Sequence, residues 1–383
     1  MGRSSPARAI SCASRSGTAS CRPTRRSATP RRSIRSSSRT AASTVLSKRR
    51  PWRNARPVEV PATGAAIPAP KKPDWLKVTL PTGDTYLTLK SRLKALGLHT
   101  VCEEARCPNL GECWASGTAT LMLLGDVCTR GCRFCAVKSG NPQGVLDSDE
   151  PSKSAAVCEA LSLRYVVLTS VDRDDLPDSG AAHFARTVKE IKARVPGIVV
   201  ETLTGDFQGK LKDITTMLAS GVDVFAHNIE TVERLQRRVR DVRATYKQSL
   251  EVLARGRKLR EGVVTKSSVM LGLGETEAEV SQTLRDLRSN GVGIVTLGQY
   301  LRPTLKHLPV KEYVTPERFE WYAEEARALG FDYVASGPLV RSSYKAAELF
   351  MLKRIAGDNT VARHDRDLSR LRSLGRASLP VLE

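Results

Sequence analysis

The sequence has no run of 18 or more apolar residues, so we expect no transmembrane helix and no membrane partner. It also has no GxGxxG fingerprint and no Walker A motif, which argues against the common nucleotide-binding loops. Residues 1–56 contain no aspartate or glutamate. Apart from Met1, the only aliphatic residues larger than alanine up to Thr44 are Ile10 and Ile34. This stretch therefore cannot build a core, and we exclude it from the fold.

The N-terminal extension, residues 1–56, instead holds 14 arginines and one lysine. These supply 15 of the 21 net positive charges, which leaves an ordinary excess of six for the other 327 residues. A basic tail can bind nucleic acid, but no recognition module follows it, so we expect no nucleic-acid partner. Arginine and serine without acidic residues are typical of organellar transit peptides, although the apolar helical face of a mitochondrial one is missing. Three interpretations stay open: a plastid-like transit segment, an atypical mitochondrial one, and a bacterial upstream stretch that is not native.

Strand and helix patterns alternate from residue 119 onward. Six such units favour an α/β fold with a parallel sheet and right-handed crossovers, wound into a complete or partial (β/α)6 barrel of the TIM type. A flat doubly wound sheet is the alternative. We expect strands at 119–124, 165–169, 198–203, 222–226, 264–270 and 294–297, and helices at 152–161, 181–194, 210–220, 244–259, 275–290 and 316–329.

The other segments divide the chain around this barrel. Residues 57–73 form a Pro/Ala linker, and residues 74–118 form a cysteine-rich N-terminal segment with a helix that begins near Tyr86. The barrel spans residues 119–335, and residues 336–383 form a C-terminal segment that caps it. Polar residues follow the expected strands, and active sites of such folds lie at the carboxyl ends of strands.

Three cysteines follow the first barrel strand with the spacing CxxxCxxC: Cys128, Cys132 and Cys135. Three thiolates on one loop can hold three irons of a [4Fe–4S] cluster, which leaves the fourth iron open to a small molecule with adjacent amine and carboxylate groups. Gly131 allows the backbone to turn between the ligands, and we expect Phe134 to shield the cluster from water. A zinc site with a distant fourth ligand and three inert thiols are the alternatives. This spacing resembles the signature of the radical S-adenosylmethionine superfamily.

A second triad, Cys102, Cys107 and Cys113, precedes the first barrel strand. It suggests another cluster that lacks one ligand; a disulfide with a free thiol, or zinc, is the alternative. CEEARCPNLGEC and CTRGCRFC together closely resemble the lipoyl synthase family, as do TSVDRDDLPD, HNIETV, MLGLGE, LGQYLRPT and GPLVRSSY, over roughly residues 74–355. The resemblance implies two [4Fe–4S] clusters, with Ser343 of the RSSY motif as the fourth protein ligand of the upstream cluster. Without the resemblance, two serines in a loop indicate a turn or a helix cap.

The resemblance further implies a sulfurtransferase that inserts sulfur at C6 and C8 of an octanoyl group on a lysine of a lipoyl-domain carrier. Two molecules of S-adenosylmethionine would be consumed, and the upstream cluster would supply the sulfide. No side chain has a pKa near that of an alkane, so we expect no acid or base residue to carry the chemistry. Other radical enzymes that insert sulfur or methylthio groups are the nearest alternative. A two-cluster electron carrier is an alternative from another class.

The implied partners are octanoylated carrier proteins, namely the E2 subunits of 2-oxoacid dehydrogenases and the glycine-cleavage H protein, and a ferredoxin- or flavodoxin-type reductant. The core resembles bacterial members, which favours the cytoplasm; a true transit peptide would instead indicate the plastid stroma or the mitochondrial matrix. A run of arginines is either a docking surface for an acidic lipoyl domain or an ordinary solvated helix face: Arg234, Arg237, Arg238, Arg240 and Arg243.

Polar residues after the expected strands are candidate contacts for S-adenosylmethionine. Ser170 follows the second strand, and Asn228 and Glu230 follow the fourth, where ribose hydroxyls or the methionine amine can be held. Each is equally expected as a helix cap. Gly272 allows a close backbone approach to an adenine. Gln299 follows the last strand and is a candidate for cofactor contact or for facing the octanoyl-lysyl substrate.

Overall fold

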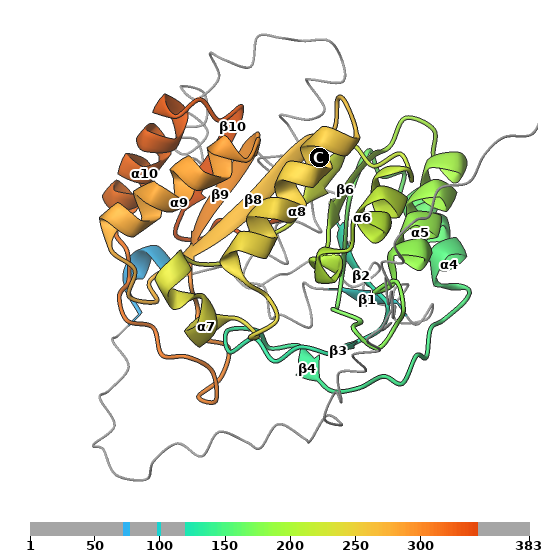
Figure 1. Ribbon diagram of the computed structural model, residues 1–383, viewed down its shortest axis with the longest axis horizontal. Coiled ribbons are helices and arrows are strands. Elements are labelled where there is room, and N and C mark those ends of the chain that lie inside the picture. Colours follow the sequence, from blue (N-terminus) through green and yellow to red (C-terminus); the bar gives the residue numbers. More distant parts are fainter. Residues whose placement is uncertain (1–71, 77–97, 101–118, 344–383) are drawn as a thin grey trace, which may run out of the picture. The chain divides into compact units, whose positions relative to one another are not determined.

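An eight-stranded sheet with helices on its outer face organises the residues that the computed structural model describes (Figure 1). These are residues 72–76, 98–100 and 119–343, all within the unit Ala66–Glu383. The N-terminal extension, the helix expected near Tyr86 and the three upstream cysteines lie outside the described residues. No helix among the described residues is long and apolar enough to cross a membrane.

The sheet follows the winding of a barrel. Its order is β1-β2-β5-β6-β7-β8-β9-β10, in which β1 is antiparallel to β2 and every other neighbouring pair is parallel. Because the order in space follows the order in the chain without a reversal, the doubly wound alternative is wrong. Within the described residues the outermost strands do not pair with each other, so the barrel is partial. The strands are β1 (His99–Thr100), β2 (Ala119–Leu123), β5 (Tyr165–Ser170), β6 (Val199–Leu203), β7 (Val224–Ala226), β8 (Val264–Leu271), β9 (Ile294–Gln299) and β10 (Tyr333–Gly337).

Amphipathic helices cover the outward side chains of the strands. In α9, for example, a capping box of Thr276 and Glu279 starts the helix, and Val280, Leu284 and Leu287 recur at helical spacing and are buried. The six long helices are α4 (Glu150–Ala160), α5 (Ala181–Arg194), α6 (Leu211–Leu218), α8 (Tyr246–Leu259), α9 (Glu277–Ser289) and α10 (Pro316–Ala328). Single turns are η1 (Asp74–Leu76), η2 (Phe207–Gly209), η3 (Glu233–Leu235) and α7 (Gln236–Val239).

An ion pair crosses the inside of the barrel among apolar side chains. Lys266 of β8 donates to both carboxylate oxygens of Glu201 of β6, at 2.7 and 2.9 Å, and both side chains are 1% exposed. The Tyr165 hydroxyl donates to the same carboxylate. The pair lies below the carboxyl ends of the strands, and beside it pack Val167, Val199, Val224, Val264 and Ile294. It fixes β5, β6 and β8 to one another.

The six predicted strands and six predicted helices are all present, with ends shifted by at most a few residues. The sequence did not predict β10, a seventh parallel strand, because its residues YVASG include two small polar or glycine positions and give only a weak strand signal. The two-residue strands β3 (Val127–Cys128) and β4 (Lys138–Ser139) and the four-residue α7 are too short for any periodic pattern.

Candidate functional site

The CxxxCxxC loop lies at the carboxyl end of β2 and is closed by a small ribbon. β3 pairs in parallel with β4, and the Gly140 amide donates to the Cys128 carbonyl at 2.9 Å. The Ser139 hydroxyl donates to the Arg130 carbonyl at 2.9 Å. The two ends of the loop are thereby brought together. Cys128, Cys132 and Cys135 are free thiols on this one closed segment.

A cavity of about 270 Å³ opens at the same end of the barrel. All three cysteines of the loop line it, as do segments that follow three successive strands, β5, β6 and β7. This is the place that the barrel fold predicts for an active site. The other lining side chains that bear on the site are Arg130, Phe134, Ser170, Asp172, Thr204, Asp206, His227, Asn228, Glu230, Arg240 and Ser342.

Backbone amides point at the cysteine sulfurs. The amides of Arg130 and Asp172 each lie 3.4 Å from Cys128 Sγ, and the amide of Asp241 lies 3.3 Å from Cys132 Sγ. Such bonds stabilise the thiolate form of cysteine, and in iron–sulfur clusters they influence the reduction potential. Burial in turn raises the pKa of the Cys128 and Cys132 thiols to about 12. The thiols therefore need a bound cation to ionise, and the donor set of three half-buried sulfurs with amide donors fits three ligands of a [4Fe–4S] cluster.

Arg130, which lies inside the loop, anchors it to two other loops. Its guanidinium is buried and binds Asp174 with two bonds of 3.0 Å and Asp206 with bonds of 2.8 and 2.6 Å. Asp206 also accepts a bond from Gln248 of α8 at 2.6 Å. This network was not predicted from the sequence. The available signal was an arginine between two predicted ligands, together with acidic residues that follow the next two strands.

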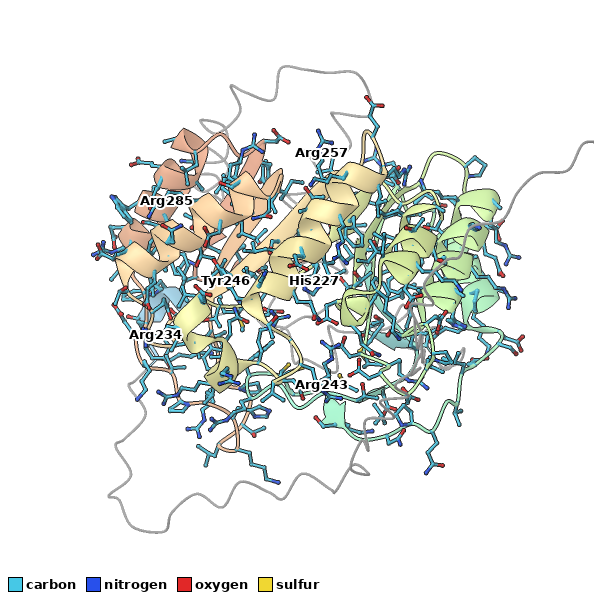
Figure 2. All side chains as sticks on the ribbon, in the orientation of Figure 1. His227, Arg234, Arg243, Tyr246, Arg257 and Arg285 are labelled. Carbon is cyan, nitrogen blue, oxygen red and sulfur yellow. The ribbon has the colours of Figure 1, made fainter. Side chains whose placement is uncertain are left out.

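A second anchor comes from the segment that follows α7. The Asp241 carboxylate accepts the Gly131 amide at 2.9 Å and two bonds from Arg243, whose guanidinium also donates to the Thr129 carbonyl at 2.7 Å. Figure 2 labels Arg243 near the place where Figure 1 draws β3 and β4. The Arg133 amide donates to the Val239 carbonyl at 2.9 Å. Helix α7 and its following turn therefore hold the outer side of the cysteine loop in place.

The predicted arginine run is not one solvated face. Arg234 pairs with Glu279 at 2.6 Å, and Arg240 is buried against the cavity, where it donates to Ser249 Oγ at 2.8 Å. Arg243 binds Asp241 and the Thr129 carbonyl in the second anchor of the cysteine loop. Only Arg237 and Arg238 are exposed and have no ion-pair partner among the described residues.

A third anchor is the segment after β9. His307 Nε2 lies 2.9 Å from the Cys135 carbonyl, and the Leu308 amide donates to the Arg133 carbonyl at 3.2 Å. The Tyr300 hydroxyl donates to the Leu308 carbonyl at 2.9 Å. The cysteine loop is thus held from three directions, and its geometry is fixed by the protein.

The candidate cofactor contacts divide into two groups. Ser170, Asn228 and Glu230 all line the cavity, and Asn228 Nδ2 donates to Glu230 at 3.1 Å. Glu230 has a positive φ of 67°, and burial raises the pKa of its carboxyl. A half-buried carboxylate that lines a cavity, on a residue with a strained backbone, is suited to hold a cation such as an ammonium group.

Gly272 and Gln299 do not line the cavity. Gln299 Nε2 donates to the carbonyls of Leu271 and Glu312, and its Oε1 accepts the Val314 amide at 2.8 Å. A Cβ on Gly272 would collide with this same amide, so the glycine admits the protein's own side chain. In the structure Gln299 binds backbone groups of its own chain and Gly272 makes room for it, so a contact of either residue with a cofactor stays a prediction.

The predicted serine ligand lies next to the cavity. Ser342 lines the cavity, and the adjacent Ser343 is half-buried. The segment that carries them crosses the end of β9 so closely that a Cβ on Gly298 would overlap the Val340 carbonyl. Because the upstream cysteines lie outside the described residues, the ligand set of the second cluster stays a prediction.

Comparison with known proteins adds independent findings. A profile of the radical SAM superfamily matches residues 122–287, and one of the N-terminal domain of lipoyl synthase matches residues 62–107. The lipoyl synthase of Thermus thermophilus is 58% identical over 280 residues, which cover 73% of this chain and 87% of that protein. That of Anaeromyxobacter dehalogenans is 59% identical, over 73% of this chain and 95% of that protein. A chloroplastic lipoyl synthase of Zea mays is 55% identical, over 76% of this chain and 84% of that protein.

Proposed function

Because the chain belongs to the lipoyl synthase family of the radical S-adenosylmethionine superfamily, we propose that it inserts sulfur at C6 and C8 of an octanoyl group on a lysine of a lipoyl-domain carrier. The observation that carries the proposal is the CxxxCxxC loop, whose three free, half-buried thiols share one cavity at the carboxyl end of the strands. The activity is that of a sulfurtransferase.

Cys128, Cys132 and Cys135 would hold the [4Fe–4S] cluster that the superfamily uses with S-adenosylmethionine. When bound, the cluster and S-adenosylmethionine supply one-electron chemistry that can break an unactivated C–H bond, which no protein base can do. The chain's own residues fix the position of the thiolates through the three anchors. Glu230 binds and orients the ammonium group of S-adenosylmethionine, and Phe134 limits the access of water.

We further propose a second [4Fe–4S] cluster held by Cys102, Cys107, Cys113 and Ser343, which supplies the inserted sulfur. Two observations support it. The profile of the lipoyl synthase N-terminal domain ends at Cys107 and so covers two of the three cysteines. The segment with Ser342 and Ser343 reaches the cavity where the sulfur is needed.

The partners follow from the reaction. The substrate proteins are octanoylated lipoyl-domain carriers, such as the E2 subunits of 2-oxoacid dehydrogenases and the glycine-cleavage H protein, and a ferredoxin- or flavodoxin-type protein supplies electrons. We propose the cytoplasm as the compartment. If residues 1–56 are a transit peptide, the plastid stroma and the mitochondrial matrix are the alternatives, and relatives with chloroplastic and mitochondrial names are both found.

The test is anaerobic reconstitution followed by chemical counting of iron and sulfide. About eight irons per chain are expected for two [4Fe–4S] clusters. An octanoyl-lysyl peptide, S-adenosylmethionine and dithionite should then give a product with a dithiolane ring, identified by mass spectrometry. Protein with about four irons and no dithiolane would contradict the second cluster, and zinc in place of iron would contradict the whole proposal.

A further inference from the structure

The outer side of the cysteine loop carries a group of cations without acidic partners. Arg133 of the loop, Arg237 and Arg238 of α7 and Lys306 of the segment after β9 are exposed, and none forms an ion pair among the described residues. We call these four residues the basic platform. Elsewhere on the described surface many arginines are neutralised, as Arg234 is by Glu279.

The basic platform is one surface, although its residues come from three segments. Arg133 Nη1 approaches the Arg238 carbonyl at 3.5 Å, and the Arg133 carbonyl accepts the Leu308 amide, two residues beyond Lys306. Figure 1 shows β3, α7 and the segment after β9 at the same end of the strands. These contacts place the segments that carry the four cations next to the cysteine loop.

Two apolar side chains flank the same surface and are unusually exposed. Leu305 is 83% exposed and precedes Lys306, and Val242 is 74% exposed and follows Asp241, which binds the loop at Gly131. Exposed aliphatic side chains among unpaired cations are typical of a site where an acidic protein partner docks.

The residues of the basic platform lie outside the lining of the cavity. None of the four lines it, and neither does Leu305 or Val242. A carrier protein must deliver an eight-carbon chain into the cavity, so it needs to cover the opening. An electron donor needs only to come close to the ligand loop, and the outer side of that loop satisfies this need.

We infer that the basic platform docks an acidic, low-potential one-electron donor protein, which reduces the cluster held by Cys128, Cys132 and Cys135 from the outer side of its loop. One electron leaves the donor, which is oxidised, and the cluster is reduced by that electron. The inference rests on the proposed function, because it requires a cluster in this loop. Charge complementarity would act mainly on the association rate.

The experiment compares two charge-reversal variants with the same change in net charge. The test variant is Arg237→Glu/Arg238→Glu/Lys306→Glu, which leaves the cysteine loop itself unchanged. The control variant is Arg164→Glu/Lys189→Glu/Lys212→Glu, whose positions are exposed, have no ion pair among the described residues and lie before β5, on α5 and on α6.

The measurement is anaerobic stopped-flow reduction of the reconstituted chain by a reduced plant-type [2Fe–2S] ferredoxin, with dithionite as a small reductant that needs no docking surface. We expect the second-order rate with ferredoxin to fall about tenfold or more in the test variant at low ionic strength, and the difference to shrink in salt. The rate of the control variant with ferredoxin should stay within about twofold of the parent rate. With dithionite, the parent and both variants should form equal amounts of product.

Three results would overturn the inference. One is an equal ferredoxin rate in the test and control variants. Another is an equally slow reduction of the test variant by dithionite, which would mean a disturbed cysteine loop. The third is an unchanged ferredoxin rate with a raised KM for the octanoylated carrier, which would assign the surface to the carrier. A parent chain that ferredoxin reduces but that forms no sulfur product with dithionite would instead contradict the proposed function.

Discussion

Removing the ammonium group of Lys266 tests whether the ion pair inside the barrel is as costly to break as its burial implies. Lys266→Met would leave the Glu201 carboxylate 1% exposed and without its cation, with only the Tyr165 hydroxyl as a partner. Loss of one member of a buried pair costs about 3–5 kcal/mol of the free energy of unfolding. For a domain of this size, this corresponds to a fall in Tm of about 10 °C.

The assay is urea denaturation of the apoprotein under anaerobic conditions, followed by circular dichroism. The matched control is Lys192→Met, because Lys192 pairs with Asp223 at the same 2.7 Å but the two side chains are 28% and 23% exposed. We expect this control to lose less than about 1 kcal/mol. The double variant Glu201→Gln/Lys266→Met removes both charges and keeps an acceptor for Tyr165, so it should regain most of the lost stability. If Lys266→Met costs no more than Lys192→Met, the burial argument is refuted.

Three further predictions concern the site. Cys107→Ala should keep the formation of deoxyadenosine but give no sulfur-bearing product, both measured by chromatography; full product from this variant would contradict the sacrificial second cluster. Glu230→Gln should raise the KM for S-adenosylmethionine about tenfold by removing a charged partner that lines the cavity, and an unchanged KM would remove Glu230 from the binding site. Burial lowers the pKa of His227 to about 4, whereas the unfolded chain takes up this proton near pH 6.5. The titration of His227 should therefore lower the free energy of unfolding by about 2 kcal/mol between pH 7 and pH 5, and His227→Gln should remove this decrease in urea titrations. The same pH dependence in the variant would contradict the role of His227.

The alternation of strands and helices could be predicted because each element carries its own period along the chain. The cysteine loop could be predicted for a similar reason, since all three thiols lie within eight residues, from Cys128 to Cys135. The partial barrel followed from the same alternation, and the strand order confirmed it. The fold and the cysteine loop could therefore be predicted because their patterns lie within short stretches of the sequence.

The anchors of the loop could not be predicted, because they join residues far apart in sequence. Arg130 and Asp206 are 76 positions apart, and Cys135 and His307 are 172 positions apart. Gln299 shows the opposite difficulty: a polar residue after a strand was a reasonable contact for a ligand, yet its amide is used by backbone groups of its own chain. Sequence position alone does not distinguish these two uses of a polar side chain.

The close crossing at Gly298 means that the place of Ser342 beside the cavity depends on the missing side chain of a glycine. Even one methyl group at this position of β9 would occupy the volume of the Val340 carbonyl. The backbone that leads to Ser342 would then have to shift outward, while the strands of the sheet could stay in place. The lack of a side chain at Gly298 thus sets how closely residues 340–343 lie against the sheet.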